Sequence, residues 1–595
     1  MEGPLAVDTI PARLLRRAEE IPGKTAYREK VDGEWLSVSW AGYADEVRRA
    51  AKALIALGFE PAQHVAILGF NRPEWVIMDV ACMAAGGSPV GVYTTNSPDE
   101  VRYITAHSAA PVVLVENADQ LDKVLARRED LPDLRWIVTM RGVTPREDPA
   151  IMTWEEFMAR GEGVPDEAFL ERMEGLEPNG LATLIYTSGT TGPPKGVMLT
   201  HHNLTWSSDA AGLVTPLTSD ERIVSYLPLS HIAEQMFTIH GAITYGYSVS
   251  YAESIEKVAD NIKEVRPTLF FAVPRVWEKF YGGVAARLAE ASGPKAVVAS
   301  WAQRVGRRYW ARRSEGAEPG ALLAFGYRLA GRLVHAKVKE ALGMDECRFA
   351  VSGAAPLSRE IVEFFCGFDL PIHEVYGQSE GSGPTTFVRN GRLRFGTVGP
   401  AFPGCEVTTA EDGEVLLRGG NVFAGYYKNP EATAETLVDG WLYSGDLGEL
   451  DGDGFLTITG RKKDIIITAG GKNIAPQNIE GAIKENLLVS EAVVVGDLRR
   501  YLTALVTLDA EAVAAFAERR GIDGPPHESP EIEAEIQATI DDVNGRSSRA
   551  AQIKRFTILP RELTVEDGEL TGTLKVKRAV VMHHFADAIE AMYVE

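Results

Sequence analysis

Hydroxyl-bearing residues, glycines and a lysine gather in residues 186–197, whose sequence is YTSGTTGPPKGV. Glycine lets a backbone approach a ligand closely, and hydroxyl and backbone N–H groups donate hydrogen bonds to anionic oxygens. Lys195 adds one compact positive charge. The composition favours a loop that holds phosphate groups, although a strand followed by an ordinary turn would share these features. It differs from a Walker loop, because Pro193 and Pro194 precede the lysine and a glycine follows it.

Three later stretches carry side chains suited to binding a nucleotide. The segment YGQSE, residues 376–380, ends a predicted strand, and open α/β sheets bind ligands at the carboxyl ends of their strands. Tyr376 can stack on a purine ring, and Glu380 is the kind of oxygen ligand that Mg²⁺ prefers. Asp446 ends the segment GWLYSGD and can accept hydrogen bonds from ribose hydroxyls. Lys575 lies in LTGTLKVKR near the C-terminus; each residue alone is equally compatible with an ordinary loop or surface position.

Alternating strands and helices must position these segments. The chain up to about residue 180 is predicted to be one α/β half-domain, in which residues 8–60 form helices around a short hairpin at 27–40. A second series follows the glycine-rich loop. Such alternation favours parallel sheets wrapped by helices. The predicted strands are 64–69, 88–92, 110–115 and 134–138 in the first series and 222–227, 268–273, 348–352 and 372–376 in the second, with helices at 73–86 and 232–246.

Short strands and tight turns replace this alternation beyond residue 398, with hairpin signals at 412–413 and 451–454. The polar, basic junction GRKKD at 460–464 precedes a separate set of strands and helices. We therefore predict domains 1–460 and 461–595. The fold class is α/β, with a large N-terminal domain of two α/β subdomains and a small β-rich subdomain, hinged to a small mobile α+β C-terminal domain.

Residues 276–345 interrupt the alternation with a long helical insertion in which aromatic residues and arginines interleave. Such a pattern is compatible with a membrane-surface contact or with a solvated helical hairpin. The aromatic residues are Trp301, Tyr309, Trp310 and Tyr327; the arginines are Arg304, Arg307, Arg308, Arg312, Arg313, Arg328 and Arg332. The more apolar run at 76–93 contains Asp79 and two glycines, so a buried helix leading into a strand fits it better than a membrane span.

The chain carries 61 Lys and Arg against 83 Asp and Glu, a net charge of −22, which argues against a nucleic-acid partner. Its four cysteines are scattered and predict reduced thiols without a structural zinc site. The N-terminal residues lack the apolar core of a signal peptide. We therefore expect a cytoplasmic protein, and the insertion leaves open a peripheral association with the inner face of the membrane.

In this order, the segments resemble the successive motifs of the adenylate-forming superfamily, which includes acyl-CoA synthetases, luciferases and adenylation domains. The resemblance covers nearly the whole chain and rests on YTSGTTGPPKGV, LPLSH, SGAAPLS, YGQSE, GWLYSGD, GRKKD, GGKNIAP and LTGTLKVKR. Within the superfamily, PLSHIAEQ, VPRVWEKF, YGQSEGSG and ITAGGKNIAPQNIE are most similar to long-chain fatty acyl-CoA synthetases, particularly their bubblegum-type branch.

The resemblance implies roles for individual residues in binding ATP. The phosphate-binding residues would be Thr187, Ser188, Gly189, Thr190, Thr191 and Lys195. The adenine and α-phosphate would lie against Ala354, Ala355, Tyr376, Gly377, Gln378 and Ser379, the ribose against Asp446 and Arg461, and Mg²⁺ on Glu380. Ser379 departs from the threonine usual at its position but keeps the hydroxyl.

Other implied roles concern catalysis and the acceptor. Lys575 would bridge the acyl carboxylate and the α-phosphate, and Lys463 lies at the hinge position. Gly470, Gly471 and Lys472 would lie on the CoA side, and His231 beside the acyl pocket, although a core position suits a lone histidine equally well. A local basic surplus in the C-terminal domain is a second candidate for meeting CoA: Lys472, Arg499, Arg500, Lys554 and Arg555.

The implied reaction activates a fatty, long-chain carboxylic acid with ATP and Mg²⁺ and then transfers the acyl group to CoA. Attack of the carboxylate on the α-phosphorus gives acyl-AMP and pyrophosphate, a displacement promoted by positioning and by cations. Two alternatives remain open: transfer of the acyl group to a carrier-protein thiol or an amine, and a non-catalytic nucleotide-binding relative. The presence of Lys195, Glu380, Asp446 and Lys575 argues against the latter.

Overall fold

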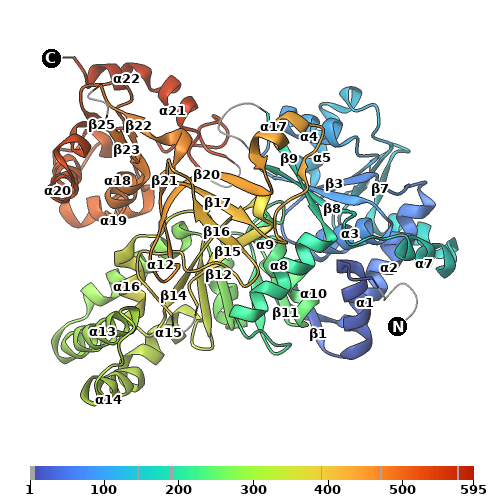
Figure 1. The fold of residues 1–595 in the computed structure, drawn as a ribbon, viewed down its shortest axis with the longest axis horizontal. Coiled ribbons are helices and arrows are strands. Elements are labelled where there is room, and N and C mark those ends of the chain that lie inside the picture. Colours follow the sequence, from blue (N-terminus) through green and yellow to red (C-terminus); the bar gives the residue numbers. More distant parts are fainter. Residues whose placement is uncertain are drawn as a thin grey trace.

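The computed structural model describes residues 7–144, 146–187, 193–389, 392–469, 472–571 and 575–594. A large mixed α/β N-terminal domain carries a smaller C-terminal domain, drawn in red at the upper left of Figure 1. This arrangement confirms the predicted fold class.

In the described part of the chain, the largest sheet has eight strands in the order β18-β9-β8-β4-β3-β5-β6-β7. The central strands run parallel, whereas β9 turns back antiparallel to β8 and β18 is added beyond it. Every residue of β3, β4 and β5 is buried, as expected for parallel strands covered on both faces. The strands are β3 (His64–Leu68), β4 (Ser88–Val92), β5 (Val112–Val115), β6 (Trp136–Thr139), β7 (Ile151–Thr153), β8 (Leu181–Thr187), β9 (Lys195–Thr200) and β18 (Gly425–Tyr426).

Two further sheets, β10-β11-β1-β2 and β12-β13-β14-β15, adjoin each other. Arg222 and Thr268 link them, since each backbone N–H bonds to an oxygen atom of the other residue. The strands are β1 (Thr25–Val31), β2 (Glu34–Ser39), β10 (Arg222–Ser225), β11 (Ser248–Tyr251), β12 (Leu269–Ala272), β13 (Phe349–Ser352), β14 (Ile372–Gln378) and β15 (Gly383–Phe387).

The N-terminal hairpin forms where the sequence predicts it but belongs to a different subdomain. Its turn places Asp32 at φ 51° and Gly33 at φ 84°, the left-handed pair of a two-residue hairpin turn. Strand β1 then pairs in parallel with β11 rather than with the first sheet. Its assignment to the half-domain ending near residue 180 was therefore wrong, because a local pattern does not specify a distant partner strand.

In the β-rich subdomain the strand order is β16-β17-β20-β19, and β21 also pairs with β20. The C-terminal domain contains two sheets, β22-β23 and β24-β25-β26. Its core is formed by β24, β25 and helices α18 and α20. The strands are β16 (Glu406–Thr409), β17 (Glu414–Arg418), β19 (Leu437–Val438), β20 (Trp441–Leu450), β21 (Leu456–Arg461), β22 (Ile466–Ile467), β23 (Asn473–Ile474), β24 (Val489–Val495), β25 (Leu502–Leu508) and β26 (Ile553–Ile558).

Helices surround these sheets and form the insertion. Those of the N-terminal domain are α1 (Ile10–Glu20), α2 (Trp40–Ala56), α3 (Pro73–Ala84), α4 (Pro98–Ser108), α5 (Ala118–Leu125), α6 (Trp154–Arg160), α7 (Asp166–Glu174), α8 (His201–Val214), α9 (Ile232–Gln235), α10 (Ala242–Tyr245), α11 (Val258–Val265), α16 (Arg359–Cys366) and α17 (Pro430–Thr436). The insertion contains α12 (Pro274–Glu290), α13 (Gly293–Ser314), α14 (Ala321–Ala330), the π-helical η4 (Gly331–His335) and α15 (Ala336–Leu342). The C-terminal domain adds α18 (Pro476–Ile483), α19 (Ala510–Arg520), α20 (Pro530–Arg546), α21 (Arg578–His584) and α22 (Ala586–Ala591).

The apolar run at 76–93 is a buried helix followed by a strand, as predicted. Every residue of α3 is buried, and the chain continues into β4. Asp79 is enclosed with it, and burial raises the pKa of its carboxyl well above the ordinary value. Among the described residues we find no helix that is both long and apolar enough to cross a membrane.

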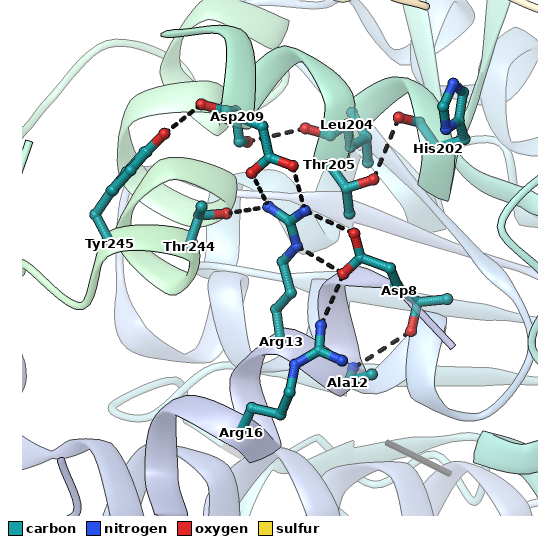
Figure 2. Close-up of polar contacts among 12 residues, drawn as sticks. Asp8, Ala12, Arg13, Arg16, His202, Leu204, Thr205, Asp209, Thr244 and Tyr245 are labelled. Carbon is teal, nitrogen blue, oxygen red and sulfur yellow. Dashed lines mark hydrogen bonds and ion pairs between the residues drawn. The ribbon is translucent and has the colours of Figure 1, made fainter. Parts of the chain in front are cut away.

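A charged cluster fixes the N-terminal helix to the rest of the large domain (Figure 2). Arg13 of α1 forms ion pairs with Asp8 at 2.7 Å and with Asp209 of α8 at 2.8 Å, and it donates to Thr244 Oγ1 of α10 at 3.1 Å. Arg16 pairs with the same Asp8. Three helices that are distant in sequence therefore converge on one guanidinium group.

Candidate active site

Asp446 and Arg461 face each other on neighbouring strands. The register of β20 and β21 places them opposite, and Arg461 Nε donates to Asp446 Oδ1 at 2.8 Å. The hydroxyl of Tyr376, at the end of β14, donates to Asp446 Oδ2 at 2.9 Å. The Asp446 charge raises the pKa of Arg461, and burial raises the pKa of Tyr376. A carboxylate offers about four lone-pair sites, so Asp446 retains capacity for ribose hydroxyls.

A close approach of two strands shapes the segment after Tyr376. A Cβ at Gly377 would lie 1.8 Å from the carbonyl oxygen of Gly383 on β15, so the site admits only glycine. Gln378 is half-buried at the end of β14, and Ser379 is buried at the start of the short helix η5 (Ser379–Gly381). This pairing fixes the point where Ser379 leaves the sheet.

The loop after β13 contains a strained alanine. Ala354 adopts φ 69°, a left-handed conformation that costs a non-glycine residue about 1–3 kcal/mol. A Cβ at Gly353 would lie 2.5 Å from Val375 Cγ1, so the loop packs directly against β14. Ala354 is half-buried and Ala355 is exposed. The loop therefore lies against the residue that precedes Tyr376, and its role in binding adenine stays a prediction.

Glu380 and Lys195 meet at a tyrosine that the sequence analysis missed. Tyr426 of β18 donates its hydroxyl to Glu380 Oε1 at 2.8 Å, and Lys195 Nζ lies 4.8 Å from the centroid of its ring. Burial and the Glu380 charge raise the pKa of Tyr426, which therefore remains a proton donor. The sequence analysis assigned no motif to this position, although Gly425 precedes the tyrosine and Lys428 follows it closely. Its place in the site depends on β18 pairing with β9, opposite Val197.

The two described ends of the glycine-rich loop lie side by side. Thr187 at the end of β8 pairs with Lys195 at the start of β9. The predicted phosphate ligands between them lie outside the described residues: Ser188, Gly189, Thr190 and Thr191. Their role stays a prediction.

Lys575 approaches this group of residues from the C-terminal domain. Loss of hydration, followed by the Arg461 charge, lowers the pKa of Lys575 to about 8, while Asp446 and Glu380 act in the opposite direction. The residue nevertheless remains exposed to solvent. Its N–H donates to Thr571 Oγ1 at 3.0 Å, and its carbonyl accepts from the Thr571 N–H at 2.8 Å. The structure thus places the lysine beside the predicted nucleotide ligands.

His231 lies near Lys575 and also has a structural role. Its Nδ1 accepts a hydrogen bond from the Ala233 N–H at 3.1 Å and caps α9. Burial and the Lys575 charge lower the pKa of His231 to about 3, so the ring is neutral with its proton on Nε2. The side chain is half-buried. The structure therefore places His231 beside the site rather than in a remote core.

The predicted helix at 232–246 is interrupted by a π-helical segment, η3 (Met236–Gly241), between α9 and α10. Such segments are rare and frequently occur at functional sites. Phe237 stacks on Phe271 of β12, with ring centroids 4.8 Å apart. A Cβ at Gly383 would lie 3.3 Å from Met236 Cγ. These contacts form an apolar wall next to His231.

Several contacts hold the C-terminal domain against the N-terminal domain. Arg275 of α12 pairs with Asp509 at 2.6 Å, and the Ser358 hydroxyl donates to Glu485 at 2.7 Å. Lys577, two residues after Lys575, lies 3.8 Å from Glu100 of α4: Nζ to Oε1. These contacts fix the orientation in which Lys575 faces the site.

The junction between the domains is anchored one residue before the predicted hinge. Lys462 lies 2.6 Å from Asp412 and 2.8 Å from Glu414, whereas Lys463 is exposed and forms no hydrogen bond or ion pair within the described chain. Lys472 is also exposed. Gly470 and Gly471 lie outside the described residues.

Two arginines of the predicted basic surplus contact the end of the chain. Arg499 pairs with Glu590, and Arg555 donates to the carbonyl of Met592 at 3.2 Å. These contacts reduce the positive charge that Arg499 and Arg555 could offer to CoA. The two lysines of this set, Lys472 and Lys554, are exposed, and Lys554 Nζ donates to Gln552 Oε1 at 2.9 Å.

Two family models together match most of the chain. AMP-binding enzyme matches residues 14–427, and AMP-binding enzyme C-terminal domain matches residues 463–595. The chain belongs to the AMP-binding enzyme family. This confirms the resemblance drawn from the motifs.

Among curated relatives of this AMP-binding enzyme, the long-chain-fatty-acid–CoA ligase ACSBG2 of Xenopus laevis is 38% identical over 603 residues, covering 96% of this chain and 81% of that protein. The long-chain-fatty-acid–CoA ligase FadD15 of Mycobacterium tuberculosis is 38% identical over 596 residues, covering 98% and 97%. The bubblegum-type relationship is thereby confirmed.

Solved structures share the fold of this AMP-binding enzyme. The adenylation domain of a carboxylate reductase from Mycobacterium chelonae superposes with a TM-score of 0.77 at 22% identity, covering 99% of this chain and 91% of that one. O-succinylbenzoate coenzyme A synthetase from Bacillus subtilis, in complex with ATP and magnesium, gives 0.68 at 21% identity, covering 95% and 98%. At these identities the likeness concerns the fold.

Proposed function

We propose that this AMP-binding enzyme is an AMP-forming long-chain fatty acid–CoA ligase. One observation carries the proposal: Tyr376, Asp446 and Arg461, from three separate motifs of the chain, form one hydrogen-bonded group. The relatives named as long-chain-fatty-acid–CoA ligases support the same activity.

In the first half-reaction, a carboxylate oxygen of the acid forms a bond to the α-phosphorus of ATP, and the bond to pyrophosphate breaks. Lys575 stabilises the negative charge that develops between the acid and the α-phosphate, and Lys195 holds the departing phosphates with the predicted loop. Tyr376 and the Asp446–Arg461 pair orient the adenosine. Positioning of this kind converts an encounter in solution into an intramolecular step.

Glu380 suits a magnesium ion by its chemistry. Its carboxylate is a hard oxygen ligand, and the Tyr426 hydroxyl occupies only part of the capacity of Oε1. Bound Mg²⁺ would neutralise phosphate charge. The protein's own contribution is to hold this carboxylate at one orientation beside Lys195.

In the second half-reaction, the CoA thiolate attacks the acyl carbonyl and AMP leaves. The acceptor needs the space that Lys575 occupies, so the C-terminal domain must rotate about the junction at Lys463. We place the domains at 1–460 and 461–595 for this movement. Gly470, Gly471 and Lys472 would then face the CoA side.

The decisive assay measures exchange of pyrophosphate into ATP with hexadecanoate and then the CoA-dependent thioester. Lys575→Ala should reduce exchange by about a hundred- to a thousandfold, a far larger loss than Lys472→Ala causes. Exchange without thioester would instead support transfer to a carrier-protein thiol or an amine. Release of ADP rather than AMP would refute both activities.

A peripheral membrane contact through the insertion is supported by an exposed apolar face on α14. Leu322, Phe325 and Leu329 are 90%, 67% and 41% exposed, with the helical spacing that places them on one side. Arginines lie on the neighbouring turns of this insertion, which projects at the lower left of Figure 1. Such a face suits an anionic bilayer.

Cosedimentation with phosphatidylglycerol vesicles tests this contact. Leu322→Ser with Phe325→Ser should abolish cosedimentation at low salt. Leu213→Ser, at a leucine of α8 that is 73% exposed, should leave it unchanged. Absence of binding by the unaltered protein would remove the membrane proposal.

A further inference from the structure

A cavity of about 810 Å³ lies among the helices between β11 and β13, most of which belong to the helical insertion. We define it as the insertion groove, lined by α11, α12, the start of α13, η4 and α15. Its volume is within the range of roughly 300–1,000 Å³ typical of ligand sites. None of the nucleotide-site residues described above lines it.

The walls of the insertion groove are hydrocarbon. Phe280 and Val284 of α12 face the cavity from one side, and Val334 and Val338 face it from η4 and α15. At its edge, Val298 and Leu333 remain 39% and 47% exposed. Removal of such surface from water is favourable by about 25 cal/mol per Å². The walls therefore suit an alkyl chain.

The same cavity is lined by cations and, among the described residues, by no carboxylate. This segregation contrasts with the net charge of −22 for the whole chain. The lining cations are Lys263, Lys279, Arg287, Lys295 and Lys337. Lys263 is 4.0 Å from Asp260 and Lys279 is 3.7 Å from Glu511, both exposed pairs, and the other three cations form no ion pair within the described chain.

These features select the class of ligand. A nucleotide without an alkyl tail would leave the apolar walls in water. A fatty carboxylate would carry a charge for only one of the five cations. A long-chain acyl-CoA supplies both an alkyl chain and several phosphate charges. We propose that the insertion groove binds long-chain acyl-CoA, the product of the proposed reaction, at a second site separate from the active site.

The position of the groove links it to the C-terminal domain. Lys279 lines the groove and also pairs with Glu511 at the start of α19, one turn after Arg275 pairs with Asp509. Gly282 of the same helix lies near Leu487. The phosphate groups of an acyl-CoA bound beside Lys279 would compete with Glu511 for the lysine ammonium group. Product bound here would therefore act on the contacts that hold Lys575 at the active site.

The test uses the full chain with its active site filled by a non-hydrolysable acyl-sulfamoyl adenosine. Calorimetric titration with monomeric hexadecanoyl-CoA should then show one remaining site per chain. Lys295→Glu combined with Lys337→Glu should weaken this site by about tenfold or more at low salt. Arg308→Glu reverses an exposed charge of α13 outside the groove and should retain binding.

Val284→Ser changes the apolar wall without changing the charge of the groove and should also weaken the second site. Absence of a second site in the unaltered protein, with pyrophosphate exchange intact, would overturn this inference and leave the proposed function standing. Absence of exchange would instead refute the function. Groove-dependent binding of phosphatidylglycerol vesicles, or of a second copy of the chain, without binding of monomeric hexadecanoyl-CoA would also overturn the inference.

Discussion

Replacement of Tyr426 by phenylalanine tests how much the position of the Glu380 carboxylate matters, because it leaves the charge of that carboxylate unchanged. The hydroxyl of Tyr426 donates to Glu380 Oε1 at 2.8 Å, while the ring lies under Lys195 Nζ. Tyr426→Phe removes the hydrogen bond and keeps the ring, so Lys195 retains its cation–π contact. The carboxylate loses one fixed donor and gains rotational freedom.

The expected magnitude follows from the strength and exposure of this bond. A hydrogen bond to a charged group contributes about 1.5–3 kcal/mol, which corresponds to roughly ten- to a hundredfold in rate. Tyr426 is buried, but Glu380 is half-buried, so water can replace part of the lost interaction. We therefore expect about a tenfold loss in kcat/KM for acyl-AMP formation.

The assay is pyrophosphate exchange across a magnesium titration, followed by thioester formation from supplied acyl-AMP and CoA. Tyr426→Phe should slow exchange and raise the magnesium concentration required, while the thioester step stays unchanged. Tyr426→Ala also removes the ring beneath Lys195 and should lose a further factor of about two to five. The matched control is Tyr427→Phe, whose hydroxyl contacts His64 Nε2 at 3.3 Å outside the site.

Unaltered exchange and magnesium dependence in Tyr426→Phe would refute the positioning role of this tyrosine. An equal loss in Tyr427→Phe would attribute the effect to general packing of the segment. Thermal unfolding of both variants distinguishes these outcomes from a fold defect, because each change deletes one hydroxyl and leaves no large cavity.

Three further predictions follow from the site. Because the pKa of Lys575 is lowered to about 8, its ammonium is present below that pH and lost above it, so kcat/KM for exchange should fall with a midpoint near pH 8. Lys575→Arg should lack this decline, and the same decline in that variant would contradict the assignment. Lys577→Glu should slow exchange by roughly two- to fivefold through repulsion from Glu100, and adding Glu100→Lys should restore it if the 3.8 Å pair holds the domains. Gly377→Ala should destabilise the protein in urea unfolding by about 3 kcal/mol, since its Cβ would meet a β15 carbonyl at 1.8 Å, whereas Gly481→Ala, with open space around it, should not.

Local sequence patterns were sufficient for most of the elements. Largely apolar runs predicted β3, β4 and β5, because strands covered on both faces are rich in apolar residues. The turn at Asp32 and Gly33 predicted the first hairpin, because it requires left-handed residues. The boundaries of β6 and the π-helical interruption of the helix at 232–246 were missed, since neither alters the local periodicity enough to be recognised.

Motif order likewise identified residues that the structure brings together. Tyr376, Asp446 and Arg461 form a hydrogen-bonded group, and Lys575 lies beside it. These residues could be recognised from the sequence because their charged, aromatic and glycine-rich segments differ in composition from the apolar strands around them. Tyr426 lacked such a signal, so its contact with Glu380 depended on the pairing of β18 with β9.

The sequence by itself therefore determined the family, the fold class and the chemical identity of the residues predicted to bind the nucleotide, because these depend on residue types in a fixed order. The tertiary structure decided which distant segments share a sheet, which domain orientation brings Lys575 to the site, and where cations collect around the insertion groove. These features arise from contacts between residues far apart in the chain. Pairing and packing across such separations depend on the whole fold, and no local period or spacing encodes them.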